Sequence, residues 1–137
     1  MKILIGYDGS EAAKAGLELA LQAAKKFKVE VHVVTSLVGS SLQFMKSKAQ
    51  GEQDLAFARR ALEEQGVACR TRLVTYGQSA GESLVEYAAE NDISVIFVGV
   101  TKKSRVDKFL LGSTAQYVIL QAPCPVLTIK SALDPQG

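Results

Sequence analysis

The chain has 137 residues, of which 47% are hydrophobic and 22% are charged, and its mean hydropathy is +0.12. This composition is typical of one folded domain and excludes a disordered chain, a collagen and a coiled coil. Sixteen basic and fourteen acidic residues give a formal charge of +2, so we expect neither nucleic acid nor a membrane surface as the partner.

The longest strongly apolar run, Val95 to Val100, is far shorter than the roughly 20 residues that a membrane-spanning helix needs. A strand-like run begins at Lys2, so we expect no secretory signal peptide and a cytoplasmic protein. The two cysteines form no metal-ligand cluster or disulfide framework, and we expect them to be small, reduced hydrophobic residues.

The first half of the chain predicts two strands and two helices. Lys2 to Gly6 is a short apolar run of the kind found in central parallel strands. A helix capped by Ser10 follows, and Val29 to Ser36 is the second predicted strand. The serine-rich segment from Leu37 to Ser47 resembles a mobile loop that either closes over a ligand or is disordered. A charged helix from about Ala49 to Gln65 should end at Gly66.

The second half continues the alternation of strand and helix. The predicted strands are Ala68 to Thr75, Ile93 to Val100 and Pro125 to Lys130. Two capping boxes, Ser79-Ala-Gly-Glu82 and Ser113-Thr-Ala-Gln116, predict the starts of the two intervening helices. Between the fourth strand and the last helix we expect a basic loop, because residues 102–108 contain four basic residues and one acid.

This βαβαβαβαβ pattern predicts an α/β domain with an open, mostly parallel sheet and helices on both faces. We expect one domain over residues 1–130 and a frayed tail over 131–137. Right-handed crossovers bring the carboxyl ends of the parallel strands to one edge, where ligands bind if the strand order reverses.

Three features at this edge suggest an anion site. Gly99 permits close approach of a ligand, Gly112 and Ser113 precede a helix whose dipole favours anions, and the basic segment lies between them. The alternative is an ordinary helix cap with solvated lysines. Asp8 is either an acceptor for an adenine amino group or a ribose hydroxyl, or simply part of an Asp-Gly turn.

Catalytic patterns are weak. His32 is the only histidine, and its place in mid-strand favours a buried imidazole with a hydrogen-bond partner over a catalytic base. The sequence has neither a P-loop nor a GxG dinucleotide fingerprint. We therefore identify no catalytic residue and no metal ligand set, and expect any ATP hydrolysis to be slow or absent.

Over about residues 1–130 the chain resembles the UspA-like universal stress proteins. The resemblance lies in Ile3-Leu-Ile-Gly-Tyr-Asp8-Gly-Ser10, His32-Val33-Val34, Val98-Gly99, Leu110-Leu-Gly112-Ser113-Thr114 and Cys124-Pro-Val-Leu127. It implies a Rossmann-like, adenine nucleotide alpha hydrolase-like fold of five strands in the order 3-2-1-4-5. It also implies a stress-response regulator with an unidentified protein partner, and a homodimer formed through the last strand, whose apolar edge would favour such pairing.

The resemblance further implies a site for ATP, AMP or ADP, with Mg²⁺ only as a companion of the nucleotide. Carried over one by one, its residues are Asp8, Val33, Val98, Gly99, Gly112, Ser113 and Thr114. The chain departs from the ATP-binding branch at position 102, where lysine replaces a loop glycine. Either Lys102 blocks the site and leaves a dimeric interaction module, or Lys102 and Lys103 contact phosphate oxygens.

Overall fold

The computed structural model describes residues 1–37, 41–77, 79–103, 108–110 and 112–130, and for residues 41–46, 101–103 and 108–110 it describes the backbone. Ten elements follow one another along the chain: β1 (Lys2–Gly6), α1 (Glu11–Ala24), β2 (Glu30–Ser36), α2 (Ser41–Glu63), β3 (Ala68–Val74), α3 (Ala80–Glu90), β4 (Val95–Lys103), β5 (Lys108–Leu110), α4 (Ser113–Gln121) and β6 (Val126–Lys130). No helix in these ranges is both long enough and apolar enough to cross a bilayer. The predicted tail, 131–137, lies outside the described residues.

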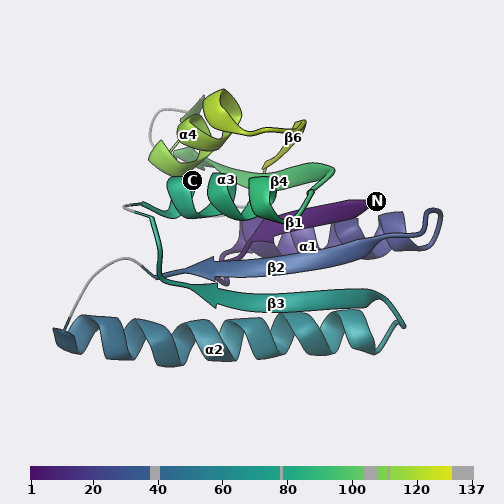
Figure 1. The fold of residues 1–137 in the computed structure, drawn as a ribbon, viewed down its shortest axis with the longest axis horizontal. Helices are drawn as coiled ribbons and strands as arrows, with labels where there is room; N and C mark the ends of the chain where they lie inside the picture. The colour runs from purple at the N-terminus through teal and green to yellow at the C-terminus, as the bar shows by residue number, and fades with distance from the viewer. Residues whose placement is uncertain (38–40, 78, 104–107, 111, 131–137) are drawn as a thin grey trace.

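Five strands form a parallel sheet. β1 pairs with both β2 and β4, β3 extends the sheet beyond β2, and β6 extends it beyond β4. Figure 1 shows the neighbouring arrows of β2 and β3 pointing the same way, with α2 alongside β3. The parallel strands therefore follow the order β3-β2-β1-β4-β6, which confirms the predicted order 3-2-1-4-5.

Helices cover both faces of the sheet, as predicted. On one face α1 and α2 bury a core that includes Leu17, Leu21, Leu62 and, from the sheet, Ile5 and Val33. On the other face α3 and α4 bury Leu84, Tyr87 and Val118 against Leu4 and Ile96. Because β1 carries Leu4 and Ile5 on opposite faces, its apolar run is the double-sided pattern of a central parallel strand.

Two predicted loops are wrong in part. Helix α2 begins at Ser41, so most of the segment predicted as a loop from Leu37 to Ser47 is helical. Leucine, glutamine, methionine and lysine in that segment are good helix formers, and this propensity outweighs the serines. Residues 38–40 lie outside the described part.

The predicted basic loop is partly a β-hairpin. The last three residues of β4 pair antiparallel with β5, with Thr101 opposite Leu110 and Lys103 opposite Lys108. The β-branched Thr101 and the apolar Phe109 and Leu110 favour this strand pairing. Residues 104–107 and 111 are outside the described range.

His32 is the buried, hydrogen-bonded imidazole that the sequence predicted. Its side chain is 1% exposed, with Nδ1 2.6 Å from the Tyr87 hydroxyl and Nε2 2.5 Å from the Glu30 carboxylate. A neutral ring protonated at Nε2 satisfies both contacts, because it donates to Glu30 and accepts from Tyr87. Burial lowers the pKa of His32, against the opposing effect of the Glu30 hydrogen bond.

This environment predicts a loss of stability in mild acid. Below its ordinary pKa of 6.5, His32 takes up a proton in the unfolded chain more readily than in the folded protein. The free energy of unfolding should therefore fall by about 1 kcal/mol between pH 7.5 and pH 5.5. Urea unfolding measured across this range should show the loss in the wild type and a flatter profile in His32→Gln. The pKa of Glu30 is itself lowered from 4.5, so Glu30 does not titrate in this window. Parallel profiles for the two proteins would contradict the account.

Candidate functional site

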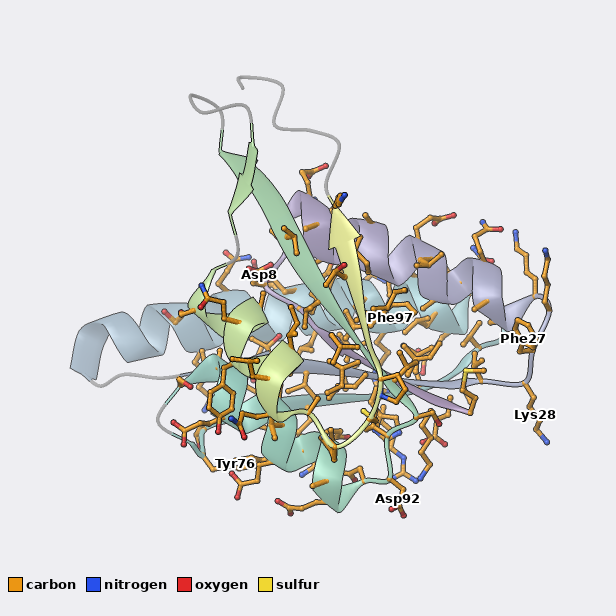
Figure 2. All side chains as sticks on the ribbon, turned by 90° about the horizontal axis from the view of Figure 1, so that it is seen from above. Asp8, Phe27, Lys28, Tyr76, Asp92 and Phe97 are labelled. Atoms are coloured by element: carbon orange, nitrogen blue, oxygen red, sulfur yellow. The ribbon has the colours of Figure 1, made fainter. Side chains whose placement is uncertain are left out.

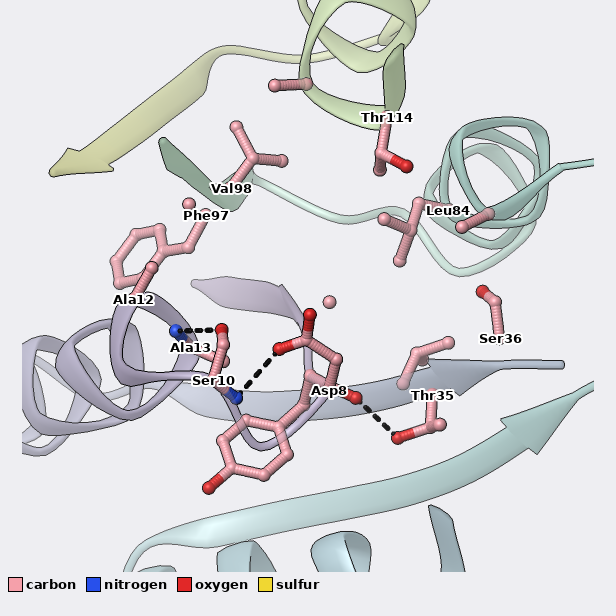
Figure 3. A pocket seen from close by; sticks show the side chains of 16 residues that line it. Asp8, Ser10, Ala12, Ala13, Thr35, Ser36, Leu84, Phe97, Val98 and Thr114 are labelled. Atoms are coloured by element: carbon pink, nitrogen blue, oxygen red, sulfur yellow. Dashed lines mark hydrogen bonds between the residues drawn. The ribbon is translucent and has the colours of Figure 1, made fainter. Parts of the chain in front are cut away.

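A pocket of about 460 Å³ lies at the carboxyl ends of β1, β2 and β4 (Figure 3). Its walls combine the strand ends with the first turns of three helices. The lining residues are Gly6, Tyr7 and Asp8 after β1; Ser10, Ala12 and Ala13 of the α1 start; Val34, Thr35 and Ser36 of β2; Ala80 and Leu84 of α3; Phe97, Val98 and Gly99 of β4; and Thr114 and Ala115 of α4.

The topology explains this location. From β1 the chain proceeds to β2 and β3 on one side of β1, and then crosses to β4 and β6 on the other side. The connections on the two sides of β1 therefore diverge and leave a crevice at the carboxyl ends of the strands.

Asp8 has one oxygen in a local turn and one directed at the pocket. Its Oδ1 accepts a hydrogen bond from the Ser10 backbone N–H at 2.9 Å, so the turn interpretation of Asp8 is correct for that oxygen. Figure 3 shows the second carboxylate oxygen pointing toward the middle of the pocket. Thr35 donates to the Tyr7 carbonyl at 2.7 Å and ties the end of β1 to β2. The Asp8 side chain is thus held in place while it keeps a free acceptor.

Gly99 is required by the packing of α1 against β4. A Cβ at this position would lie 2.6 Å from the Cβ of Ala12, which is closer than two carbon atoms that are not bonded to each other can approach. Glycine therefore allows the first turn of α1 to lie directly on β4. Gly9 turns the chain between β1 and α1 with a φ of +78°, a conformation that other residues rarely adopt.

The three helix starts at the pocket differ in how their amides are used. The Ser10 hydroxyl accepts from the Ala13 N–H in α1, and the Ser79 hydroxyl accepts from the Glu82 N–H in α3, both at 3.2 Å. Both serines are N-caps, as predicted. Helix α4 instead has Gly112 as its N-cap and no side-chain cap hydrogen bond.

The predicted capping role of Ser113 is therefore wrong, because Ser113 is the first residue inside α4. The first helical hydrogen bond of α4 runs from the Gln116 N–H to the Gly112 carbonyl at 3.0 Å. The N–H groups of Ser113, Thr114 and Ala115 precede that bond, and Thr114 and Ala115 line the pocket. Within the described part of the chain no side chain caps these N–H groups. This helix start therefore presents donors and the positive end of a dipole to the pocket, an arrangement that suits an anion.

The predicted site residues fall into four groups. Four of them, Asp8, Val98, Gly99 and Thr114, line the pocket. Gly112 and Ser113 lie at the exposed start of α4. Val33 is fully buried in the core beneath α1 and α2, while its neighbour Val34 lines the pocket. Lys102 and Lys103 are the last residues of β4, and their side chains lie outside the described part of the structure.

The sequence reasoning missed the apolar walls of the pocket. Ala12 and Ala13 enter from α1, Ala80 and Leu84 from α3, and Phe97 from β4. The serine caps at positions 10 and 79 could have indicated the walls contributed by α1 and α3, because they mark helices that begin at the edge of the pocket.

No group of three or more His, Cys, Asp or Glu side chains that could hold a metal ion occurs in the described ranges. Tyr7 is 3% exposed, and its hydroxyl has no hydrogen-bond partner among the described residues. Burial raises the pKa of Tyr7 to about 12, and the carboxylates of Asp54, Asp8 and Glu11 add to the effect. Tyr7 therefore stays protonated at neutral pH and is a poor general base.

Comparison with known proteins identifies the family. The model of the universal stress protein family matches residues 1–130. The chain belongs to this family. A universal stress protein of Methanocaldococcus jannaschii is 34% identical over 140 aligned positions, covering 94% of this chain and 81% of that protein.

Two solved structures show the same fold. The universal stress protein from Archaeoglobus fulgidus is 30% identical and superposes with a TM-score of 0.85, covering 95% of this chain and 98% of the other. A structure of the universal stress protein from Archaeoglobus fulgidus in complex with dAMP is 29% identical, with a TM-score of 0.77 and the same coverage. The Rossmann-like α/β fold expected from the sequence is thereby confirmed.

Proposed function

We propose that this universal stress protein binds an adenine nucleotide in the pocket between β1 and β4. The observation that carries the proposal is that a hydrogen-bond acceptor, the Asp8 carboxylate, and a set of backbone N–H donors, at the start of α4, lie on opposite sides of one cavity. The second carboxylate oxygen of Asp8 lies on one side, and the start of α4, which has no side-chain cap hydrogen bond, lies on the other with Thr114 (Figure 3).

Each side matches one part of a nucleotide. A carboxylate oxygen accepts hydrogen bonds from an adenine amino group or from a ribose hydroxyl. The N–H groups at the start of α4 suit a phosphate. Leu84, Phe97 and Val98 line the same pocket and provide the apolar surface against which an adenine base can pack. The relative from Archaeoglobus fulgidus that was solved with dAMP supports the same assignment.

Lysine at position 102 does not abolish the site in this proposal. Asp8, Gly112 and Ser113 are retained, and a lysine ammonium can contact phosphate oxygens as a point charge. We infer that binding of ATP, AMP or ADP changes the contacts of the protein with a regulatory partner in the cytoplasm, with Mg²⁺ present only alongside the nucleotide. Hydrolysis should be slow or absent, because His32 faces Tyr87 and Glu30 and does not line the pocket.

Substitution of Gly112 tests the anion site directly. An aspartate N-cap would accept from the α4 amides and place a negative charge where the phosphate should lie. A Cβ at Gly112 meets nothing within 4 Å, so the side chain fits. Gly112→Asp should raise the free energy of unfolding by a few tenths of a kcal/mol and weaken AMP binding at least about tenfold.

The matched control is Gly112→Ala, which adds the same Cβ without an acceptor. Calorimetric titration should show that Gly112→Asp binds AMP more weakly than Gly112→Ala, while the two variants bind adenosine equally. Equal AMP affinities in the two variants would remove the start of α4 from the site.

A second candidate function, a dimeric interaction module, is favoured by apolar surface on α4 and β6. Leu120 is 76% exposed, and Ile119 and Leu127 are each 41% exposed. Strand β6 pairs with β4, and no strand in the described part of the chain pairs with its other edge. Exposed apolar edge strands favour pairing with a second chain, so we propose a homodimer formed through β6.

Light scattering should report a dimer at a few tens of micromolar. Leu127→Lys should give a monomer, because it places a charge in the proposed interface. Phe27→Lys is the matched control and should remain dimeric, because Phe27 is 58% exposed at the far end of the molecule from α4 (Figure 2). A monomeric wild-type protein would contradict this candidate.

A further inference from the structure

We propose that Tyr7 couples the nucleotide pocket to helix α2: its hydroxyl, which has no hydrogen-bond partner among the described residues, donates to the Asp54 carboxylate once a nucleotide occupies the pocket. The inference rests on the proposed function, and it concerns how occupancy of that site is transmitted through the turn between β1 and α1. Two independent observations carry it: the unpartnered Tyr7 hydroxyl, and the close contacts between α2 and residues that line the pocket.

Tyr7 differs from the other buried polar side chains of the described ranges. It is 3% exposed and packs in the core formed with α1 and α2, yet its hydroxyl is the one buried side-chain nitrogen or oxygen atom in those ranges without a hydrogen-bond partner. By contrast Tyr87, also 3% exposed, has its hydroxyl 2.6 Å from His32 Nδ1. A phenylalanine would fill the Tyr7 site without the cost of an unpaired hydroxyl, so packing alone does not account for this group.

Asp54 of α2 is the acceptor that the surroundings of Tyr7 offer. A Cβ added to Gly9 would lie 3.0 Å from Asp54 Oδ1, so this half-buried carboxylate lies against the turn that follows Tyr7. A carboxylate has about four acceptor positions, and Gln50 Nε2 uses one of them at 3.1 Å. Burial is the main cause of the raised pKa of Tyr7, and Asp54 has the largest effect among the neighbouring carboxylates. A hydroxyl that donates to a carboxylate makes one of the stronger hydrogen bonds in proteins.

Helix α2 contacts the residues that line the pocket from behind. Tyr7 and Thr35 both line the pocket, and the Thr35 hydroxyl donates to the Tyr7 carbonyl at 2.7 Å. On the side of α2, a Cβ at Gly51 would lie 3.2 Å from Thr35 Cγ2. Asp8 follows Tyr7 directly in the chain, so a nucleotide that bonds to Asp8 acts on the segment that lies between the pocket and α2.

The Tyr7 hydroxyl gives the bound and unbound proteins a difference in hydrogen bonding. A ligand shifts an equilibrium between two conformations only by as much as it binds one of them better. The conformation with the Tyr7–Asp54 hydrogen bond satisfies the buried hydroxyl, and a nucleotide that fixes Asp8 and the turn after it favours that conformation. Because this bond joins the end of β1 to α2, the packing of α2 then depends on whether the pocket is filled.

The test uses two conservative variants of the full chain, Tyr7→Phe and Tyr87→Phe, which remove a hydroxyl from equally buried tyrosines. Without nucleotide, Tyr7→Phe should unfold at the same urea concentration as the wild type or a higher one, because it removes an unpaired group, whereas Tyr87→Phe should unfold at a lower one. Calorimetric titration should show that AMP binds about tenfold more weakly to Tyr7→Phe and with unchanged affinity to Tyr87→Phe. Adding Asp54→Ala to Tyr7→Phe should weaken AMP binding no further, because both changes remove the same bond.

Proton NMR gives a readout that a purely structural role of Tyr7 would not move. The hydroxyl signal that is missing from Tyr7→Phe should shift downfield when AMP is added to the wild type, as a proton donated to a carboxylate does. The same signal should not shift when AMP is added to Asp54→Ala.

The outcomes separate the two proposals. If the wild type binds AMP and Tyr7→Phe binds it equally tightly, the coupling is overturned and the proposed nucleotide function stands. A Tyr7→Phe protein that is less stable than the wild type without nucleotide would show that a water molecule or another group already pairs the hydroxyl, and this would also overturn the coupling. If the wild type binds no AMP at millimolar concentration, the proposed function fails and the coupling fails with it.

Discussion

Parallel pairing of β1 with both β2 and β4 is the constraint on which the rest of this structure depends. It brings three carboxyl ends to one edge, and it places the first-half strands β2 and β3 on one side of β1 and the later strands β4 and β6 on the other, so that the connections on the two sides diverge. The pocket follows from this divergence. Gly99 then sets its shape, because only a residue without a Cβ lets Ala12 and the first turn of α1 lie against β4. The packing of the core and the position of the site therefore share one cause.

The second determinant is the unequal treatment of the helix starts. A serine cap occupies one amide donor at the start of α1 and one at the start of α3, whereas α4 has Gly112 as its N-cap and, among the described residues, no side-chain cap. A serine or aspartate at position 112 would suit the helix better, since those residues are stronger N-caps. Glycine at this position makes α4 slightly less stable, and it leaves the positive end of the α4 dipole facing the pocket and the carboxylate of Asp8. This opposition makes a ligand with an uncharged, hydrogen-bonding base and an anionic tail the best match.

Much of the fold could be predicted from the sequence, because hydrophobic periodicity and capping residues are local signals. The run from Lys2 to Gly6 and the caps at Ser10 and Ser79 were predictable in this way. The strand order came from the resemblance to the universal stress proteins, because local signals do not fix which strands are neighbours. The start of α2 was not, because serines around position 41 suggest a loop while the residues after them favour helix. The β5 strand was missed because its three residues lie in a basic segment that lacks the usual length of a strand. In the site, Asp8 and Gly99 were predictable as strand-end residues, whereas the apolar walls depend on tertiary packing. The role of Gly112 as N-cap was hidden by the serine beside it.

The central claim is that one pocket holds a base near Asp8 and a phosphate at the start of α4. A crystal structure of the protein grown with AMP tests it most directly. The account predicts phosphate oxygens within about 3 Å of the Thr114 and Ala115 amides, with the adenosine lying between Leu84 and Val98 toward Asp8. Electron density for the nucleotide elsewhere on the surface, or a pocket that stays empty at saturating AMP, would contradict it.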